Sequence, residues 1–340
     1  MTGGWTIVPA AEAGFARDPG EAIEAAFARG ELAGLHAVVV ARHGRLVSER
    51  YFAGADWRWG QSLGVVRFGP EVRHDLRSVS KSIVGLLYGQ ALAAGKVPAH
   101  EVPLLDVFRD YTDLAADPAR RALTVGHALT MTLGTAWDES LPYSDPRNSE
   151  IAMEMAVDRF RFVLGQPIET PPGQRWRYSG GATALLGEII ARGTGMGLLE
   201  YARQALFGPL GIEDVEWITG SNGREAAASG LRLRPRDLAR IGQALLDGGG
   251  GAIPPAWLAA SFTPQARIDA EIDYGYQWYL YNGSTGGSPW MAAFGNGGQR
   301  LVVIPRLGLV VAVMCGNYDA ADQGSMPRRV LREFVLGALA

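Results

Sequence analysis

Lysine and cysteine are scarce in this chain of 340 residues. Of its 32 lysine and arginine residues only two are lysine, Lys81 and Lys96, and its one cysteine is Cys315. A single cysteine excludes an internal disulfide, and its place in the apolar run 309–315 indicates a buried thiol. Arginine stays protonated in proteins, whereas a desolvated lysine can lose its proton and act as a base. The few lysines of such a chain are therefore candidates for chemistry that needs an amine.

Long apolar runs and basic runs are also missing. No apolar run approaches the roughly 20 residues that span a bilayer, and residues 1–9 lack the pattern of a secretory signal, so we predict a cytoplasmic location. The net charge is −3, and the cations are scattered along the chain. This distribution argues against nucleic acid and membrane surfaces as partners.

The histidines are not spaced as metal ligands usually are. No His-x-x-x-His pair or cysteine-rich pair occurs, so we interpret the histidines as lone surface or core residues and expect no metal and no cofactor. The five positions are His36, His43, His74, His100 and His127.

Apolar periodicity predicts strands at both ends of the chain and helices between them. Asp18-Pro19-Gly20-Glu21 is typical of a helix start, and the predicted helix ends at about residue 29. The predicted strands are residues 35–42, 45–52, 274–281, 299–304 and 309–314. Further helices are predicted at residues 80–94, 124–132, 183–192, 235–247 and 327–336.

This order predicts an α+β fold with two lobes. An antiparallel sheet is assembled from both chain termini, residues 1–75 and 251–340, and is flanked by helices. A mostly helical lobe of residues 76–250 is inserted after the first hairpin. We expect the functional cleft to lie between the two lobes.

Ser78 and Lys81 form the first chemical motif. The polar stretch before Ser78 gives way to helical periodicity, so both side chains share one face of a helix's first turn. The exposed amides of that turn can bind a developing oxyanion, and the positive helix end disfavours a protonated lysine. A neutral Lys81 could then accept the proton of Ser78. Alternatively, Ser78 only caps the helix and Lys81 is solvated.

Two further motifs follow in a telling order. A glycine-bounded tyrosine, Tyr178, precedes an apolar helix, and Phe294-Gly295-Asn296-Gly297-Gly298-Gln299 opens a late strand. Together with the segment 76–82, this order resembles the penicillin-recognising serine hydrolases. It is most similar to their class C β-lactamase-like branch, which includes esterases, D-amino-acid peptidases and 6-aminohexanoate-dimer hydrolases. The resemblance covers about residues 35–335 and implies the β-lactamase/transpeptidase-like fold.

The resemblance implies an acyl-enzyme mechanism. Ser78 would be the nucleophile, Lys81 its activating partner and Tyr178 the group that carries protons to the leaving group. In the family two backbone amides form the oxyanion hole, and they match those of Ser78 and Gln299. Glycines at 297 and 298 would let substrate approach the strand edge. Because Lys81 and Tyr178 would share protons, the base is not assigned to either residue.

Departures from the family pattern narrow the substrate. Relatives with a Tyr-x-Asn motif hold substrate amides with the asparagine, but Gly180 stands there in this chain. Where β-lactamases usually have lysine or histidine, this chain has Asn296, whose neutral amide cannot attract a substrate carboxylate as a cation does. We therefore predict a serine hydrolase for carboxyl esters or small linear amides. Tyr143, in the loop 137–143, is a predicted substrate-pocket residue.

Alternatives remain open at this point. The same site could act on a β-lactam or as a D-amino-acid peptidase, or the chain could be a non-catalytic penicillin-binding or sensor protein. A Ser-His-Asp hydrolase is disfavoured, since no Gly-x-Ser-x-Gly elbow occurs and every histidine precedes residue 128.

Overall fold

Strands from both ends of the chain form one sheet. The computed structural model describes residues 4–220 and 223–340, so residues 1–3 of the first predicted segment lie outside it. The main sheet has the order β1-β3-β2-β14-β13-β12-β11-β10-β9. It contains β1 (Thr6–Ile7), β2 (Leu35–Arg42), β3 (Arg45–Tyr51), β9 (Ala266–Arg267), β10 (Ile272–Tyr274), β11 (Tyr279–Tyr281), β12 (Trp290–Gly295), β13 (Gln299–Ile304) and β14 (Leu309–Cys315). The late strand β14 pairs antiparallel with the early strand β2, which confirms the predicted assembly.

The sheet departs from the prediction at three places. β1 runs parallel to β3 rather than antiparallel. The predicted strand 274–281 is a hairpin of β10 and β11, because Gln277 has a φ of 66° and reverses the chain. A hairpin that the sequence patterns did not reveal, β4 (Ala53–Arg58) with β5 (Gln61–Arg67), forms a separate two-stranded sheet. A third small sheet joins β6 (His74–Asp75), β8 (Leu231–Leu233) and β7 (Glu216–Trp217).

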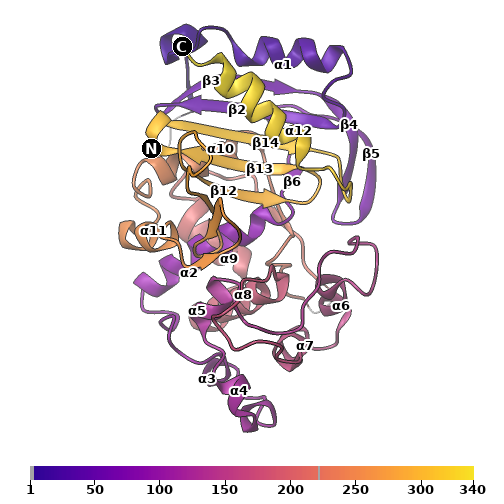
Figure 1. Ribbon diagram of the computed structural model, residues 1–340, viewed down its shortest axis with the longest axis vertical. Coiled ribbons are helices and arrows are strands. Elements are labelled where there is room, and N and C mark those ends of the chain that lie inside the picture. Colours follow the sequence, from indigo (N-terminus) through magenta and orange to yellow (C-terminus); the bar gives the residue numbers. More distant parts are fainter. Residues whose placement is uncertain (1–3, 221–222) are drawn as a thin grey trace.

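Helices cover both faces of the main sheet (Figure 1). Side chains alternate along each strand, so Val38 and Val40 of β2 belong to one apolar cluster and Ala37 and Val39 to the other. The first cluster packs under α1 and the C-terminal helix, and the second faces α2, α8 and α10. The helices are α1 (Pro19–Ala28), α2 (Val79–Ala93), α3 (Leu104–Val107), α4 (Pro118–Arg121), α5 (Val125–Leu129), α6 (Ser149–Met155), α7 (Arg159–Gly165), α8 (Gly180–Thr194), α9 (Leu198–Ala202), α10 (Pro235–Leu246), α11 (Pro255–Ser261) and α12 (Ser325–Arg329).

α10 belongs with the sheet, although the sequence assigned it to the helical lobe. It packs against β2, β13 and β14, and its Gly242 is so close to the sheet that a Cβ would lie 2.5 Å from a methyl group of Val310. The periodicity of the α10 sequence predicts that the helix has an apolar face, but it does not indicate whether that face packs on the sheet or on other helices. The division into two lobes at residue 250 stays a prediction.

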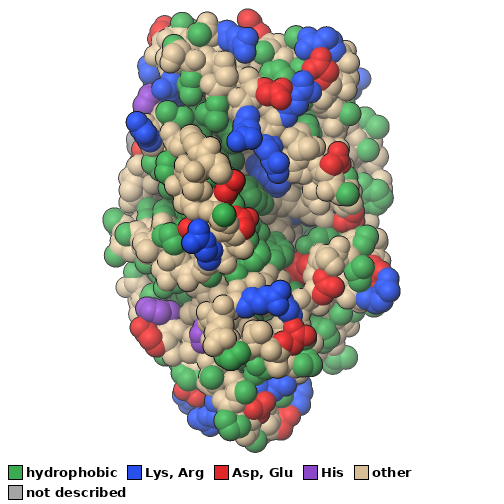
Figure 2. Space-filling model, viewed as in Figure 1, with side chains coloured by type: hydrophobic (Ala, Val, Ile, Leu, Met, Phe, Trp, Pro, Cys, Tyr) green, Lys and Arg blue, Asp and Glu red, His purple; other side chains and the backbone are tan. Residues whose placement is uncertain are grey.

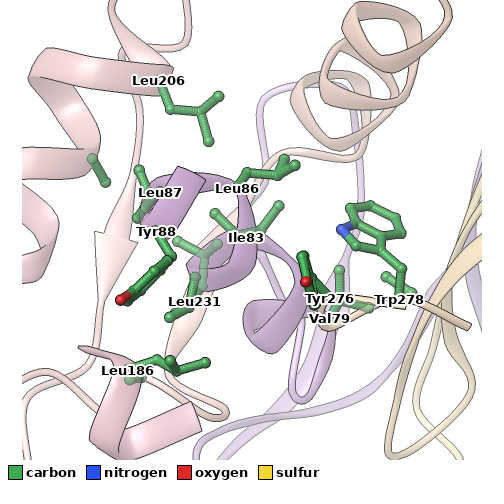
Figure 3. Close-up of a cluster of buried hydrophobic side chains, with 14 of the residues drawn as sticks. Val79, Ile83, Leu86, Leu87, Tyr88, Leu186, Leu206, Leu231, Tyr276 and Trp278 are labelled. Atoms are coloured by element: carbon green, nitrogen blue, oxygen red, sulfur yellow. The ribbon is translucent and has the colours of Figure 1, made fainter. Parts of the chain in front are cut away.

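α2 is the central helix of the molecule. Its residues are buried from Val79 to Ala91, with apolar side chains around the whole circumference, as expected of a helix enclosed by other elements. Figure 3 shows side chains of α2 meeting Leu186 of α8 and Leu231 of β8 on one side and Trp278 on the other. The start of α2 is therefore held in place by both the helices and the sheet.

The surface and the helices agree with the charge and hydropathy of the sequence. In residues 4–220 and 223–340, no helix is long and apolar enough to cross a membrane. Figure 2 shows acidic and basic side chains interspersed over one face of the molecule, and this face is hollowed near its centre.

Leu301 tests the packing of α10 on the sheet. Its side chain is fully buried in β13 beneath α10, so Leu301→Ala leaves a cavity and should lower the free energy of unfolding by about 2–5 kcal/mol. Leu63→Ala, on the exposed β5, is the matched control and should cost less than about 0.5 kcal/mol. Chemical denaturation measures both. Equal costs would contradict this packing.

Candidate active site

Ser78 lies directly before α2 in a strained turn. Arg77, the preceding residue, has a φ of 49°, a left-handed conformation that is uncommon outside glycine. Ser78 itself is buried and makes no capping hydrogen bond, which argues against a purely capping role. The amides of residues 79–81 donate to carbonyls of the preceding turn. These three amides are thus unavailable to a substrate, contrary to the expectation that they would bind an oxyanion.

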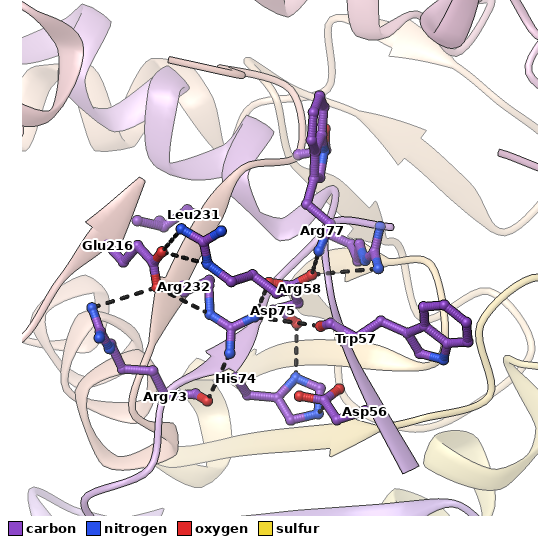
Figure 4. A network of polar contacts seen from close by, with 12 residues as sticks. Asp56, Trp57, Arg58, Arg73, His74, Asp75, Arg77, Glu216, Leu231 and Arg232 are labelled. Atoms are coloured by element: carbon purple, nitrogen blue, oxygen red, sulfur yellow. Dashed lines mark hydrogen bonds and ion pairs between the residues drawn. The ribbon is translucent and has the colours of Figure 1, made fainter. Parts of the chain in front are cut away.

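Asp75 fixes the segment that leads to Ser78. Its buried carboxylate accepts hydrogen bonds from the Arg232 guanidinium at 2.6 Å and from the Trp59 amide at 2.7 Å, and it lies 3.4 Å from Arg77. Figure 4 shows Arg232 and Arg77 both reaching Asp75. Because Trp59 lies at the tip of the β4–β5 hairpin, the same carboxylate also holds that hairpin against the segment that contains Ser78.

Lys81 is a fully engaged ammonium group. Its Nζ donates to Ser78 Oγ at 3.0 Å, to the Ala228 carbonyl at 3.0 Å and to Glu150 Oε2 at 3.1 Å. An ammonium group has three donors, and these three acceptors use them all. Burial, the largest single effect, lowers the pKa of Lys81, but Glu150, Tyr178 and Glu139 together outweigh it and raise the pKa above its usual range. The expectation of a neutral Lys81 is therefore wrong for the resting site, because the sequence did not reveal these neighbouring carboxylates.

Tyr178 lies over the same ammonium group. Lys81 Nζ is 4.9 Å from the centre of the Tyr178 ring. Burial raises the pKa of the Tyr178 hydroxyl to about 12, and Lys81 opposes this shift. Tyr178 precedes α8, where Ser179 caps the helix by accepting from the Ala182 amide at 3.1 Å. The fold thus brings Tyr178 next to Ser78 and Lys81, which lie about 100 residues earlier in the chain.

A second carboxylate, Glu139, lies beside this group. It accepts hydrogen bonds from Trp137 Nε1 at 2.6 Å, the Tyr143 hydroxyl at 2.9 Å and the Gly180 amide at 2.5 Å. Burial, followed by repulsion from Glu150, raises the pKa of Glu139 to about 7. Sequence patterns did not identify Glu139 or Glu150 as site residues, because both come from loops or helix starts far from Lys81 in the chain.

Ser78 opens into a cavity with about 510 Å³ of empty space, including the solvent at its mouth. Of the predicted site residues, Ser78, Tyr143 and Asn296 line this cavity. Trp59, Arg77 and Ile151 also line the cavity, although no sequence pattern predicted them as site residues. Lys81, Tyr178 and Gly180 are not part of this lining. Lys81 contacts Ser78, Tyr178 lies over Lys81, and Gly180 contacts Glu139 and Glu150.

The glycine-rich motif is the turn between β12 and β13. Gly297 and Gly298 have φ values of 86° and 99°, and a Cβ at either would collide with the segment 315–323. These glycines therefore serve the turn and its packing, and neither lines the cavity. Gln299 is fully buried, and its side chain bonds both backbone groups of Cys315. Asn296, three residues earlier, is the part of the motif on the cavity wall.

Asn296 and Arg300 have partners of their own. Asn296 Nδ2 donates to Asp319 Oδ1 at 2.7 Å, and the Asp319 amide donates back to Asn296 Oδ1 at 2.9 Å. The Arg300 guanidinium stacks on Phe294 and donates to the Gln299 carbonyl at 2.8 Å. Neither side chain adds a free cation to the cavity.

The sequence model of the beta-lactamase family matches residues 21–332. This chain belongs to the beta-lactamase family.

Two relatives found by sequence comparison are named as hydrolases. A 6-aminohexanoate-dimer hydrolase of Paenarthrobacter ureafaciens is 25% identical over 303 residues, which are 81% of this chain and 71% of the relative. Esterase EstB of Burkholderia gladioli is 26% identical over 200 residues, 55% of this chain and 48% of the esterase. This chain thus aligns with about half of that esterase.

Solved structures confirm the predicted fold. EstCE1, described as a hydrolase with promiscuous acyltransferase activity, has a TM-score of 0.75 at 17% identity, with 93% of this chain and 97% of that chain covered. A penicillin-binding protein from Bacillus halodurans has a TM-score of 0.69 at 16% identity, with 89% and 98% covered. At this level of identity the likeness concerns the fold alone.

Glu150 occupies the space that the asparagine of the beta-lactamase family's Tyr-x-Asn motif would need. A Cβ at Gly180 would lie 2.2 Å from Glu150 Oε2, so no side chain fits at position 180 while Glu150 is in place. Asn148 positions Glu150 at the start of α6 by accepting from the Glu150 amide at 3.0 Å. We interpret this carboxylate from another helix, which bonds Lys81, as compensation for the missing asparagine.

A double-mutant cycle tests this compensation. Gly180→Asn should cost about 1–3 kcal/mol through overpacking, and Glu150→Ala about 3–5 kcal/mol because it leaves Lys81 buried without its anion. In the double variant the asparagine has room beside Lys81, so the two costs should be less than additive by about 0.5–3 kcal/mol. Gly165→Asn, with open space around it, is the control. Additive costs, measured by chemical denaturation, would disprove the compensation.

Glu139 should give stability a defined pH dependence. Between the ordinary pKa of 4.5 and the raised value of about 7, the folded protein keeps a proton on Glu139 that the unfolded chain releases. The free energy of unfolding should therefore fall as pH rises through this range. Glu139→Gln should make this decline shallower, and Glu200→Gln, on an exposed surface, should leave it unchanged. Parallel declines in wild type and Glu139→Gln would show that Glu139 is ionised throughout.

Proposed function

We propose that this protein is a serine hydrolase that cleaves carboxyl esters or small linear amides through an acyl-enzyme on Ser78. The observation that carries the proposal is the 3.0 Å contact between Ser78 Oγ and the buried Lys81 ammonium, with Tyr178 beside it, at a cavity of substrate size. Its partner would be a small-molecule ester, amide or β-lactam-like substrate. A cytoplasmic location stays a prediction from the sequence.

The proton of Ser78 enters a coupled group in this proposal. Ser78 Oγ attacks the substrate carbonyl carbon, and Lys81 can accept the serine proton only after giving one of its own away, since an ammonium nitrogen has no lone pair. Glu150, 3.1 Å from Lys81, is an acceptor for that proton. Tyr178 then passes its proton to the leaving alcohol or amine as the bond to the carbonyl carbon breaks, and it regains a proton from Lys81. Water then attacks the acyl-serine ester and gives one proton to the same coupled group, and the released Ser78 oxygen takes one back.

Two backbone amides would stabilise the oxyanion. The resemblance assigned this role to the amides of Ser78 and Gln299. We keep both amides in the proposal: Asn296, in the same turn as Gln299, lies on the cavity wall, so this hairpin borders the cavity beside Ser78. Gly295 brings the hairpin close to Ser78: a Cβ there would lie 2.4 Å from the Leu76 carbonyl, so the hairpin passes directly beside the segment before Ser78.

The cavity favours a substrate without a required carboxylate. Trp59, Tyr143 and Ile151 offer it aromatic and apolar surface. Asn296 is neutral and already bonded to Asp319, and the Arg77 guanidinium is held by Asp75 and the Tyr318 ring at 4.6 Å. The names of the relatives, an amide hydrolase and an esterase, point to the same substrate classes.

Acylation by three reagents tests the proposal. The protein is incubated with p-nitrophenyl butyrate, a β-lactam and a fluorophosphonate, and intact mass and peptide mapping locate any adduct. We expect one adduct on Ser78, turnover of the ester and slow or no release of the β-lactam. Rapid β-lactam turnover would make the protein a β-lactamase instead. No adduct from any reagent would favour a non-catalytic penicillin-binding or sensor protein.

Three variants test the assigned roles. Ser78→Ala should abolish ester turnover, and so should Lys81→Arg, because arginine keeps the charge but cannot pass a proton. Tyr178→Phe should slow acyl transfer by about 10² to 10⁴. Lys96→Arg changes the other lysine of the chain and should leave turnover unchanged. Full activity in Lys81→Arg, with folding verified by circular dichroism, would rule out proton transfer through Lys81.

A further inference from the structure

Three buried side chains behind the nucleophile segment form a compact cluster. His36 of β2, Asp56 of β4 and His74 of β6 are each at most 1% exposed. One ligand atom from each lies within 4.8 Å of the other two. His36 Nδ1 is 2.9 Å from His74 Nε2, and His74 Nε2 is 3.7 Å from Asp56 Oδ1. Sequence patterns did not predict this cluster, because its members are 18 to 38 residues apart in the chain.

The hydrogen bonds around the cluster orient it inward. His74 Nδ1 lies 2.8 Å from the Asp75 carbonyl, which can only accept, so Nδ1 carries the hydrogen and Nε2 presents its lone pair to the cluster. Figure 4 shows His74 next to Asp56. The Tyr318 hydroxyl donates to Asp56 Oδ1 at 2.8 Å. Imidazoles and carboxylates that ligate metals are typically held by outer contacts of this kind.

The buried carboxylate of Asp56 is incompletely satisfied. Its Oδ2 finds no hydrogen-bond partner among the residues that the structure describes, and the neutral His74 ring, 3.7 Å from Oδ1, supplies no counter-charge. An anion that is 1% exposed with one oxygen unpartnered is costly unless a cation neutralises it. A cation bound among the three side chains would supply both the charge and the missing contact.

The surroundings make room for these rings and fix them. Phe68 stacks on the His36 ring at 4.5 Å and lies 5.0 Å from the His74 ring. Glycines at 54 and 316 flank His36, and a Cβ at either position would come within 2.4 Å of its ring. No larger residue fits on either side of His36 while its ring holds this position.

We propose that His36, Asp56 and His74 bind one divalent transition-metal ion of the zinc class. Two nitrogens and one carboxylate oxygen suit zinc or cobalt, whereas calcium and magnesium prefer oxygen ligands throughout. Two atoms bonded to one zinc ion at about 2.0–2.1 Å are themselves about 2.9–3.4 Å apart at angles of 90–109°. The two histidine nitrogens already have this spacing, and the hydrogen that His36 Nδ1 donates to His74 Nε2 would shift to His36 Nε2 when the ion binds. The Asp56 carboxylate would move closer to both rings, since the three ligand atoms are at present within 4.8 Å of one another.

The ion would tie three strands together beside the cavity. β2 belongs to the main sheet, β6 leads directly to Ser78, and β4 carries the hairpin whose tip, Trp59, lines the cavity. The hairpin is otherwise a two-stranded sheet with exposed apolar residues such as Val65. Metal binding therefore fixes the position of a cavity wall without taking part in the reaction at Ser78.

Cobalt and zinc titrations test the site on the full-length protein. After treatment with chelator and dialysis, the protein is titrated with CoCl₂, followed by visible absorption, and with ZnCl₂, followed by metal analysis and thermal unfolding. We expect one ion per chain, displacement of cobalt by zinc, and a higher unfolding temperature with zinc than with chelator. A wild-type protein that takes up no stoichiometric cobalt or zinc overturns the proposal by itself.

Variants locate the ion. Asp56→Asn and His36→Gln should each weaken cobalt binding by about 100-fold or more, and Tyr318→Phe, outside the ligand set, by about 10- to 100-fold. His100→Gln removes an exposed histidine that pairs with Glu101 and should bind as the wild type does. Circular dichroism verifies folding. Equal binding by the wild type and a folded His36→Gln/Asp56→Asn double variant overturns the assignment. Metal uptake and Ser78 acylation are separate readouts, so either can fail alone.

Discussion

The buried ammonium of Lys81 is the interaction around which the site is arranged. It joins the proposed nucleophile Ser78, the Glu150 carboxylate of α6 and the Ala228 carbonyl ahead of β8, so three distant segments are held at one nitrogen. A buried cation without an anion would cost several kcal/mol, and this requirement fixes where α6 lies relative to α2. The electrostatic need of one side chain therefore positions the carboxylates, and with them the cavity wall.

Small residues make this arrangement possible. Gly180 leaves the space that the Glu150 carboxylate fills, and it offers its own amide to Glu139. Gly295 lets the β12–β13 hairpin pass beside the Leu76 carbonyl. A side chain at either position would push apart elements whose contact defines the site. In the proposed compensation, Gly180 in place of the asparagine is thus paired with Glu150, which lies 30 residues away in the chain.

The β4–β5 hairpin links two features of the molecule. Its tip places Trp59 on the cavity wall, and the Trp59 amide donates to Asp75, which lies three residues before Ser78. Its first strand carries Asp56 into the histidine cluster. The segment from residue 53 to 67 thus contacts both the proposed reaction site and the proposed metal site. An ion bound at Asp56 would therefore help to hold Trp59 in its place on the cavity wall.

The sequence by itself determined the elements and the family. Capping residues and periodicity predicted α1, β2, β3, α8 and β13 closely, and the order of the serine–lysine, tyrosine and glycine-rich motifs was enough to name the family. Capping residues and periodicity are local features, and the motifs follow one another along the chain in the order that the family shows. Only the tertiary structure decided that Lys81 is paired with Glu150, that Asn296 rather than Gln299 lines the cavity, and that two unrelated histidines meet at Asp56. Such contacts depend on how distant segments pack in three dimensions, and no local spacing encodes them.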